Sequence, residues 1–356
     1  MAKDFIVAIE LGSSKITGIA GKKNPDGSIT VLSVAKEDSK ACMRKGVVYN
    51  IDKTAQALTN IINKLKGSLQ TDIARVYVGV GGQSLKGVKN VVVKDLPADS
   101  IVTQDIVNEL MDTNRNMKNN DYEVLDAITQ EYKVDMLDEL NPVGVQACHI
   151  EGNFLNLLWR KTFNRSLNKC FDNAGIPIVE MYVTPLAMAE EILTEAEKCA
   201  GCMLVDLGAD TTTVAIYTRD ILRHLFVLPL GSNNITKDLT ALKMEEREAE
   251  AMKLKYASAY PEVADIDDSM VWAIDNNRSV NSRLFIDVVE ARVLEIIANV
   301  WYLVPTEYTD KLLGGIILTG GGSNLKNIDD AFRRHTHIDK VRIAKFLPLN
   351  ILPETA

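Results

Sequence analysis

The sequence predicts an α/β protein in which two similar domains close on a cleft, with a small α+β subdomain inserted into the first domain. A pattern of an apolar strand, an acid, Leu, Gly and then small and hydroxyl residues occurs twice, at residues 7–17 and 203–213. A polar, strand-rich stretch interrupts the first half at residues 83–165. The chain has 356 residues, too many for one ordinary core, so two domains are expected.

Each repeated segment has the features of a phosphate-binding turn. A buried strand brings a carboxylate to its end, and a glycine lets the backbone turn sharply into the next strand. Such a turn presents backbone N–H groups that form a concave anion site. The carboxylate is placed to hold a hydrated metal ion on the phosphates of a nucleotide. One such turn is common in hairpins, but two copies in matched context indicate two domains that close on one phosphate chain.

Two further patterns suit the rest of a nucleotide. Residues 316–323 form a strand, a run of three glycines and a helix start, where a flat ligand can lie against the backbone. A plain tight turn is the alternative. Glu250 and Lys253 lie three residues apart on a predicted helix, so both are on one face and could hydrogen-bond a ribose. The alternative for this pair is a solvated ion pair.

The composition argues against several classes of function. With 40 basic and 48 acidic residues the net charge is −8, which argues against broad nucleic-acid binding. Five scattered cysteines and an N-terminus unlike a signal peptide are typical of a reduced, cytosolic protein. We interpret Cys199 and Cys202 as small buried side chains of a helix-to-strand turn. His335 and His337 lack neighbouring ligands for a metal site.

The elements of the first domain are expected in the order β-β-β-α-β. The sequence indicates a hairpin over residues 5–21, a strand over 28–35, a helix over 52–65 capped by Asp52, and a buried strand over 75–80. The glycine-rich turn at residues 79–82 matches neither a dinucleotide motif nor a P-loop, and we interpret it as a domain boundary.

The inserted stretch is expected to contain one helix and long strands. They are predicted over residues 103–117 for the helix and over 122–134 and 145–159 for the strands. The first domain then resumes with a helix over 162–174 closed by Gly175, a buried strand over 176–183, and a helix from Pro185 to Glu197.

The second half repeats the plan of the first. The predicted elements are strands over residues 203–207, 212–217 and 222–228, a helical region over 235–303 broken near Pro261, a strand over 315–319, and a helix over 327–334.

In this order the segments resemble the phosphate-one, phosphate-two and adenosine motifs of the actin-like ATPase superfamily, which includes actin, sugar kinases and heat-shock chaperones. Further phrases are similar to those of the FtsA family of bacterial cell-division proteins, from Phe5 to about Ile343. The polar insertion after Gly82 lies where the FtsA family has its own inserted subdomain and actin has none. The similar phrases outside the nucleotide motifs are at residues 76–79, 130–135, 141–144, 228–231, 235–238 and 249–256.

The resemblance implies an actin-like (ribonuclease H-like) two-domain fold with a nucleotide cleft and an FtsA-type α+β inserted subdomain. The implied division of the chain is a first actin-like domain at residues 1–82 and 166–190, the insertion at 83–165, a second actin-like domain at 191–235 and 305–356, and a smaller subdomain of the second half at 236–304.

The resemblance also implies which residues would bind ATP and Mg²⁺. Phosphates would be held by Gly12, Ser13, Ser14 and Lys15 in the first turn and by Gly208, Ala209, Asp210, Thr211 and Thr212 in the second. Adenosine would be held by Glu250, Lys253, Gly320, Gly321, Gly322 and Ser323, with Gly231 close to the site. Glu10 and Asp206 would lie near the magnesium ion and reach it through water.

The chain departs from the family pattern at three places, two of them in the second motif. Asp210 stands where a glycine is usual, and its carboxylate would repel phosphates unless it points away or meets the metal. Thr213 stands where an acid is frequent, which removes a group that could orient the metal or the attacking water. A glycine pair is usual where Gly231 and Ser232 stand, a milder change. We therefore expect hydrolysis to be slow or absent.

By resemblance, the protein is an ATP-binding adaptor of cell division. Such adaptors form actin-like polymers, link filaments of the tubulin-like protein FtsZ to the inner face of the cytoplasmic membrane at the division site, and recruit other division proteins. The acidic and apolar C-terminal tail of FtsZ would dock on residues 236–304. Arg278, Arg283 and Arg292 are candidate contacts there, and ordinary surface arginines are the alternative.

Members of the FtsA family attach to the membrane through a C-terminal amphipathic helix. Residues 341–356 show no such pattern, and Pro348 and Pro353 argue against a helix there. We expect either a trimmed chain, which we favour, or a variant that does not bind membrane alone.

Two other functions stay open on the sequence. A small-molecule kinase of the same superfamily would need a general base that faces a substrate hydroxyl in the cleft. No Asp of the first domain has a kinase-like context. The other is a pilus-assembly relative of the FtsA family, which has a similar insertion and a different partner.

Overall fold

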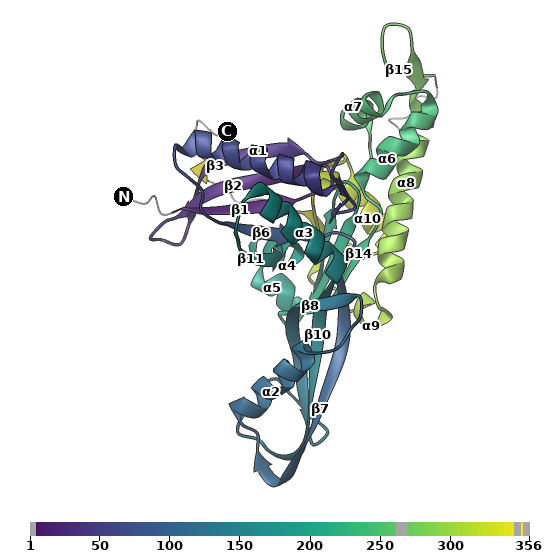
Figure 1. Cartoon of the computed structure of the whole chain (residues 1–356). Coiled ribbons are helices and arrows are strands. Elements are labelled where there is room, and N and C mark those ends of the chain that lie inside the picture. The colour runs from purple at the N-terminus through teal and green to yellow at the C-terminus, as the bar shows by residue number, and fades with distance from the viewer. Residues whose placement is uncertain (1–4, 261–268, 345–349, 352–356) are drawn as a thin grey trace.

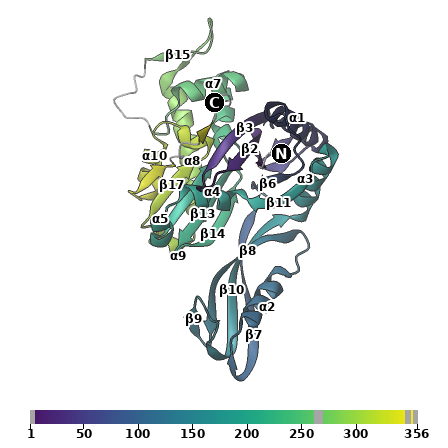
Figure 2. The same cartoon turned by 90° about the vertical axis from the view of Figure 1, so that its left-hand side faces the viewer.

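The chain folds into two α/β halves that lie side by side, and a third, elongated part extends away from both (Figures 1 and 2). The computed structural model describes residues 5–260, 269–344 and 350–351.

The first half is built on a sheet that starts from a β-hairpin. β1 (Ile6–Leu11) pairs antiparallel with β2 (Lys15–Lys23), and β2 pairs antiparallel with β3 (Ile29–Asp38). β6 (Val76–Val80) runs parallel to β1, β11 (Ile178–Val183) runs parallel to β6, and β19 (Asn350–Ile351) pairs with β3. Alternate residues of β1 point into the core, as the period-2 pattern predicts. α1 (Ile51–Leu69) and α3 (Lys161–Ala174) pack on this sheet and share its core.

The second half has the same kind of sheet. β12 (Cys202–Leu207), β13 (Thr212–Thr218) and β14 (Ile221–Leu228) form an antiparallel meander. β17 (Gly315–Thr319) runs parallel to β12, and β18 (Val341–Ile343) runs parallel to β17. Every residue of β17 is buried, as in a central parallel strand that is covered on both faces. The helices that pack with this sheet are α6 (Ser232–Leu239), α8 (Ser282–Leu303) and α10 (Ile328–Thr336).

The two sheets are duplicates in strand order. The first runs β3-β2-β1-β6-β11, with β19 added beyond β3, and the second runs β14-β13-β12-β17-β18. In both, the middle strand carries the acid of the repeated motif at its carboxyl end. The sequence repeat is therefore a structural repeat, and both candidate turns occupy equivalent places.

The insertion forms a separate antiparallel sheet with one helix on it (Figure 2). Its strands are β7 (Lys86–Ile101), β8 (Tyr122–Val134), β9 (Leu137–Glu139) and β10 (Gln146–Arg160), in the order β7-β10-β8-β9. α2 (Gln104–Arg115) covers one face, and Leu110 packs with Phe154 and Ile150. The Thr103 side chain caps α2 by accepting the Ile106 N–H.

The insertion also packs on the second half, although it is connected in sequence to the first. Leu155 and Leu157 of β10 share a core with Leu225 of β14. A Cβ at Gly87 would lie 2.9 Å from the Leu225 carbonyl oxygen, so the two backbones can approach only because this residue is glycine.

Shorter elements complete the chain. They are β4 (Met43–Arg44), β5 (Val47–Val48), α4 (Thr184–Ile192), α5 (Glu195–Ala200), η1 (Thr240–Leu242), α7 (Glu246–Tyr256), β15 (Val271–Ala273), β16 (Ser279–Asn281), α9 (Thr306–Thr309) and η3 (Gly321–Asn324).

Several predictions about elements are wrong in detail. Asn50, not Asp52, caps α1, because its side chain accepts the Lys53 N–H. β11 is largely accessible and not a buried strand, since it lies at the edge of the sheet. The helix that begins near Pro185 ends at Ile192, and a new capping box at Thr194 starts α5.

Two further expectations also need correction. The region 235–303 is not continuously helical, because the β15–β16 hairpin lies within it. Of the two cysteines interpreted as buried, Cys202 is buried but Cys199 is exposed.

Some expectations concern residues that the structure does not describe. The helix break near Pro261, and the argument from Pro348 and Pro353 about the C-terminal residues, lie outside the described ranges. Within those ranges, every helix is either too short or too polar to cross a bilayer.

Candidate functional site

The two repeated turns have the same backbone geometry. In the first, the Gly12 N–H donates to the Lys15 carbonyl at 3.0 Å, and in the second the Gly208 N–H donates to the Thr211 carbonyl at 2.9 Å. A Cβ at either glycine would lie 2.7 Å from that same carbonyl oxygen, so each turn closes only around glycine.

Both turns leave two consecutive N–H groups free. Among the described residues, no acceptor receives the N–H groups of Ser13 and Ser14 in the first turn, or those of Ala209 and Asp210 in the second. Consecutive free N–H groups in a tight turn form an anion-binding concavity. Each half of the molecule therefore offers one such concavity at the end of its central hairpin.

Two carboxylates stand beside these turns. Glu10 ends β1 and is open to the cleft, but the protein around it removes much of its hydration and raises its pKa to about 7. The charge of Asp206 raises the pKa of Glu10 further, and Lys15 opposes both effects. Burial at the end of β12 raises the pKa of Asp206 to about 6. The acids from the two halves are thus close enough to repel each other.

The three-glycine segment lies against the second turn. Gly320 has a φ of 83°, and a Cβ there would lie 2.2 Å from Asp206 Oδ1. A Cβ at Gly322 would lie 2.9 Å from the Leu207 carbonyl oxygen. Ser323 donates its hydroxyl to the Gly320 carbonyl at 2.7 Å and fixes the segment. A Cβ at Gly321 would meet no atom within 4 Å, so there is open space beside this part of the backbone.

The start of α6 holds the second turn in place. The N–H groups of Ser232 and Asn233 donate to the carbonyls of Gly208 and Ala209 at 2.9 and 2.8 Å. A Cβ at Gly231 would lie 2.5 Å from the Ala209 carbonyl oxygen, so this position also needs glycine. Gly231 therefore supports the turn from behind.

Glu250 and Lys253 lie on one face of α7, as predicted, and form an ion pair with a 2.7 Å separation. Lys253 is 7% exposed and also donates to Thr236 Oγ1 at 2.8 Å, so a solvated surface pair is the wrong description. Burial alone would raise the pKa of Glu250, but hydrogen bonds from Lys253 and Thr236 lower it overall. The pair connects α7 to α6 and thereby to the second turn.

No sequence pattern predicts the β4–β5 hairpin, yet its tip lies between the two turns. The Gly46 N–H donates to Ser13 Oγ of the first turn at 2.8 Å. The Lys45 N–H donates to Asp210 Oδ2 of the second turn at 3.3 Å. The tip is tight, with φ of 50° at Lys45 and 72° at Gly46. Each strand of the hairpin has only two residues, so the sequence shows no period that could have identified it.

The glycine-rich turn after β6, interpreted from the sequence as a domain boundary, lies beside Glu10 of the candidate site. Gly79 pairs with Glu10, just as Thr319 pairs with Asp206 in the second half. Residues 79–82 are therefore the structural counterpart of the three-glycine segment. A cavity of about 320 Å³ opens beside them and is lined by Glu10, Gly79, Tyr182 and Thr184.

Each of the three candidate arginines for a partner already meets at least one acid within residues 236–304. Arg278 donates to Asp275 and Glu248 and joins the β15–β16 hairpin to α7. Arg292 of α8 binds both carboxylate oxygens of Asp238, at 2.5 and 3.1 Å. Within the residues that the structure describes, Arg283 pairs with Asp287, one turn along α8, and its side chain is half exposed.

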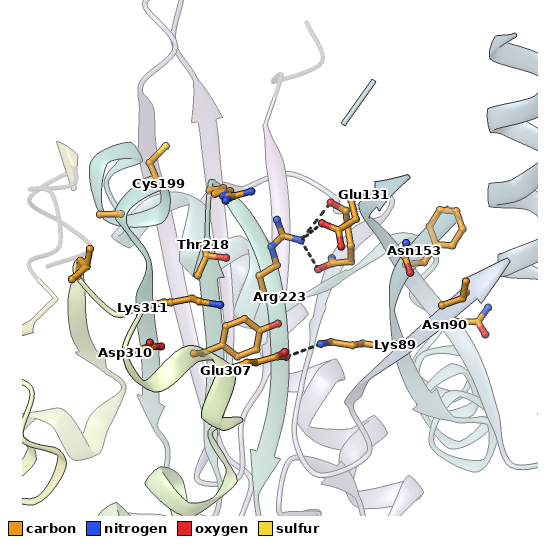
Figure 3. Close-up of a pocket in the computed structure, with 17 residues that line it drawn as sticks. Lys89, Asn90, Glu131, Asn153, Cys199, Thr218, Arg223, Glu307, Asp310 and Lys311 are labelled. Atoms are coloured by element: carbon orange, nitrogen blue, oxygen red, sulfur yellow. Dashed lines mark hydrogen bonds and ion pairs between the residues drawn. The ribbon is translucent and has the colours of Figure 1, made fainter. Parts of the chain in front are cut away.

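A larger cavity lies away from the turns, where the insertion meets the second half (Figure 3). Its volume is about 580 Å³. Arg223 of β14 donates to the Gln130 carbonyl and side-chain oxygen, both at 3.4 Å, and Lys89 pairs with Glu307 at 2.8 Å (Figure 3). Since these bonds cross between the two parts, the cavity is lined by the side chains that anchor the insertion.

Known proteins resemble this chain in sequence. The family model "Cell division protein FtsA" matches residues 203–351, and the model "SHS2 domain inserted in FTSA" matches residues 82–158. The cell division protein FtsA of Porphyromonas gingivalis is 32% identical over 333 residues, which cover 92% of this chain and 70% of that protein. FtsA of Neisseria meningitidis is 28% identical and covers 91% of this chain and 80% of its own length.

Solved structures show the fold. The PilM–PilN type IV pilus biogenesis complex matches with a TM-score of 0.65 at 14% identity, covering 98% of this chain and 91% of the matched chain. MreB5 of Spiroplasma citri bound to ADP matches with a TM-score of 0.57 at 12% identity, covering 96% and 92%. These matches confirm the predicted actin-like fold with its insertion. The sequence match to FtsA of Porphyromonas gingivalis shows that the chain belongs to the FtsA family of cell division proteins.

Proposed function

We propose that the cleft between the two halves binds ATP. The observation that carries this proposal is the pair of identical turns, each with two free N–H groups, placed at equivalent ends of duplicated sheets. Phosphates would lie between the turns, adenosine against Gly320 and Gly321, and the ribose near Glu250 and Lys253. The similarly folded MreB5 of Spiroplasma citri is bound to ADP, which supports a nucleotide in this fold.

Mg²⁺ would be held at Glu10 and Asp206, mainly through water. In the described part of the chain, no group of three or more His, Cys, Asp or Glu side chains could hold a metal ion alone. Phosphate oxygens and waters would therefore complete its coordination. The pKa values of both carboxyls are raised, since burial disfavours their charged forms. A divalent cation nearby would favour the charged forms again, so both side chains could face the ion as carboxylates. The ion would neutralise phosphate charge.

Slow or absent hydrolysis is part of the proposal. Thr213 is buried in β13, and no carboxylate stands at that position. A hydroxyl cannot act as a general base for water near neutral pH as a carboxylate can. Nucleotide would then stabilise one arrangement of the two halves and not be a substrate for rapid turnover.

We further propose that the protein is a peripheral adaptor at the division site. It would form actin-like filaments, bind the FtsZ tail and other division proteins, and attach to the inner face of the cytoplasmic membrane. Membership of the FtsA family supports this function. We propose that the FtsZ tail binds at residues 236–304, the region that the resemblance to the FtsA family implies.

The outer face of α8 suits an acidic and apolar tail. Leu284, Leu294 and Tyr302 are 51%, 41% and 86% exposed on this helix. Arg283 precedes Leu284 and is half exposed beside its ion pair with Asp287, so its guanidinium can also meet an acid of the tail. Arg278 and Arg292 hold the subdomain together and are poor probes of partner binding, because replacing them removes internal ion pairs.

The experiment is fluorescence anisotropy of a labelled FtsZ C-terminal peptide from the same organism, titrated with this chain. We expect saturable binding, and Arg283→Glu should weaken it about fivefold, because an attractive rim charge becomes repulsive. Arg115→Glu, the same charge reversal on exposed α2, is the matched control and should change nothing.

Two results would contradict the proposal in different ways. If the folded wild-type chain fails to bind the peptide, the adaptor function is wrong. If Arg283→Glu binds like Arg115→Glu, the function stands and the position of the tail on α8 is wrong.

A further inference from the structure

Asp210 joins the two halves of the molecule beside both phosphate turns. Its Oδ1 accepts a hydrogen bond from Asn233 Nδ2 of α6 at 2.9 Å, within the second half. Its Oδ2 accepts the backbone N–H of Lys45 at 3.3 Å, from the first half and 165 residues away in sequence. The carboxylate therefore points toward the first half and does not turn away from the cleft.

The Lys45 N–H is held in a fixed position. The Lys45 carbonyl accepts the Gln83 N–H at 2.9 Å, and the neighbouring Gly46 N–H is bound to Ser13 Oγ at 2.8 Å. A Cβ at Gly46 would lie 2.4 Å from the Cα of Gly82, so the tip packs directly on the glycine-rich turn. Asp210 thus meets a rigid part of the first half, next to the Ser13 N–H that would receive a phosphate.

The charge of Asp210 is not offset by a cation. Both of its partners are neutral groups, an amide side chain and a backbone N–H. In the described part of the chain, no Lys, Arg or His side chain forms an ion pair with it, whereas Glu250 and Glu197 each have one. An uncompensated carboxylate at the edge of a phosphate site repels each phosphate in proportion to that phosphate's charge.

We propose that Asp210 is a specificity-determining residue that disfavours nucleoside triphosphates relative to diphosphates in this cleft. The inference rests on the proposed nucleotide binding and deepens it. A triphosphate carries one more negative group than a diphosphate, so the carboxylate costs more binding free energy for ATP than for ADP. Asp210 also accepts the Lys45 N–H across the cleft, so this donor already has an acceptor from the protein.

The test compares ATP and ADP affinity by isothermal titration calorimetry for wild type and Asp210→Asn, with Mg²⁺ and with EDTA. Asn keeps the size and an acceptor oxygen but removes the charge. We expect Asp210→Asn to bind ATP about tenfold and ADP about threefold more tightly than wild type, with or without Mg²⁺. Asp220→Asn is the control, since it makes the same charge change at the exposed turn at the opposite end of β13.

Three results would overturn the inference. An unchanged ratio of ATP to ADP affinity in a folded Asp210→Asn protein would show that the charge does not act on the terminal phosphate. Weaker binding by Asp210→Asn only with Mg²⁺ would make the carboxylate a metal ligand. If wild type and both variants bind neither nucleotide, the proposed nucleotide site itself fails, and this inference fails with it.

Discussion

At the scale of single residues, Glu10 shows how the cleft changes an ordinary acid. Its carboxyl lies at the end of a strand, opposite Asp206 from the other half, and its pKa is raised from 4.5 to about 7. Between these two pH values, the Glu10 carboxyl is mostly neutral in the folded protein and mostly charged in the unfolded chain. Without a cation in the cleft, ionising Glu10 therefore opposes folding.

This shift has a testable consequence for stability. The pKa of Glu10 is higher in the folded than in the unfolded chain, so folding stability falls as pH rises from about 4.5 through about 7. Glu10→Gln should raise the Tm of the nucleotide-free protein at pH 8, and the difference should disappear below about pH 4.5. Thermal unfolding in EDTA across this range measures it. A Tm difference that stays constant with pH would exclude ionisation of Glu10 as its cause.

At the scale of elements, the two turns show why glycine is needed at Gly12 and Gly208. Gly12 and Gly208 do not have a positive φ. Glycine is needed at both positions because a carbonyl oxygen lies too close for a Cβ atom. A methyl group at Gly208 would push the Thr211 carbonyl away, open the turn and redirect the free N–H groups of Ala209 and Asp210.

Gly208→Ala should therefore weaken ATP binding by about tenfold or more while the fold survives. Gly67→Ala is the matched control, because a Cβ on that glycine of α1 meets nothing within 4 Å. Calorimetric titration with ATP, after circular dichroism has shown both variants to be folded, measures the effect. Equal affinity in the two variants would mean that the second turn does not contact the nucleotide.

The sequence predicts these turns because each is formed by a few consecutive residues between two strands that are long enough to show a period. The two-residue strands β4 and β5 are too short to show a period, so the Lys45–Asp210 contact could not be predicted. The β15–β16 hairpin escapes prediction for the same reason. The pairing of Arg292 with Asp238 is another case, because a pattern of residue types does not show which surface charges meet across 54 residues.

At the scale of the whole molecule, duplication explains the architecture. Two sheets of the same strand order each place one turn with two free N–H groups at equivalent positions, and the β4–β5 tip touches both turns. The insertion leaves the first half after Gly82, packs on β14 of the second half, and is anchored there by Arg223. The insertion therefore contacts both halves. A nucleotide that moved one half relative to the other would also move the insertion.

The most direct test of the account is amide hydrogen exchange of the wild-type chain with and without Mg²⁺ and ATP. If both halves bind one phosphate chain, exchange should slow together at residues 12–15 and 208–211, because the free N–H groups of both turns gain acceptors. Slower exchange in one turn alone, or in neither, would contradict the claim that the duplicated turns form a single nucleotide site.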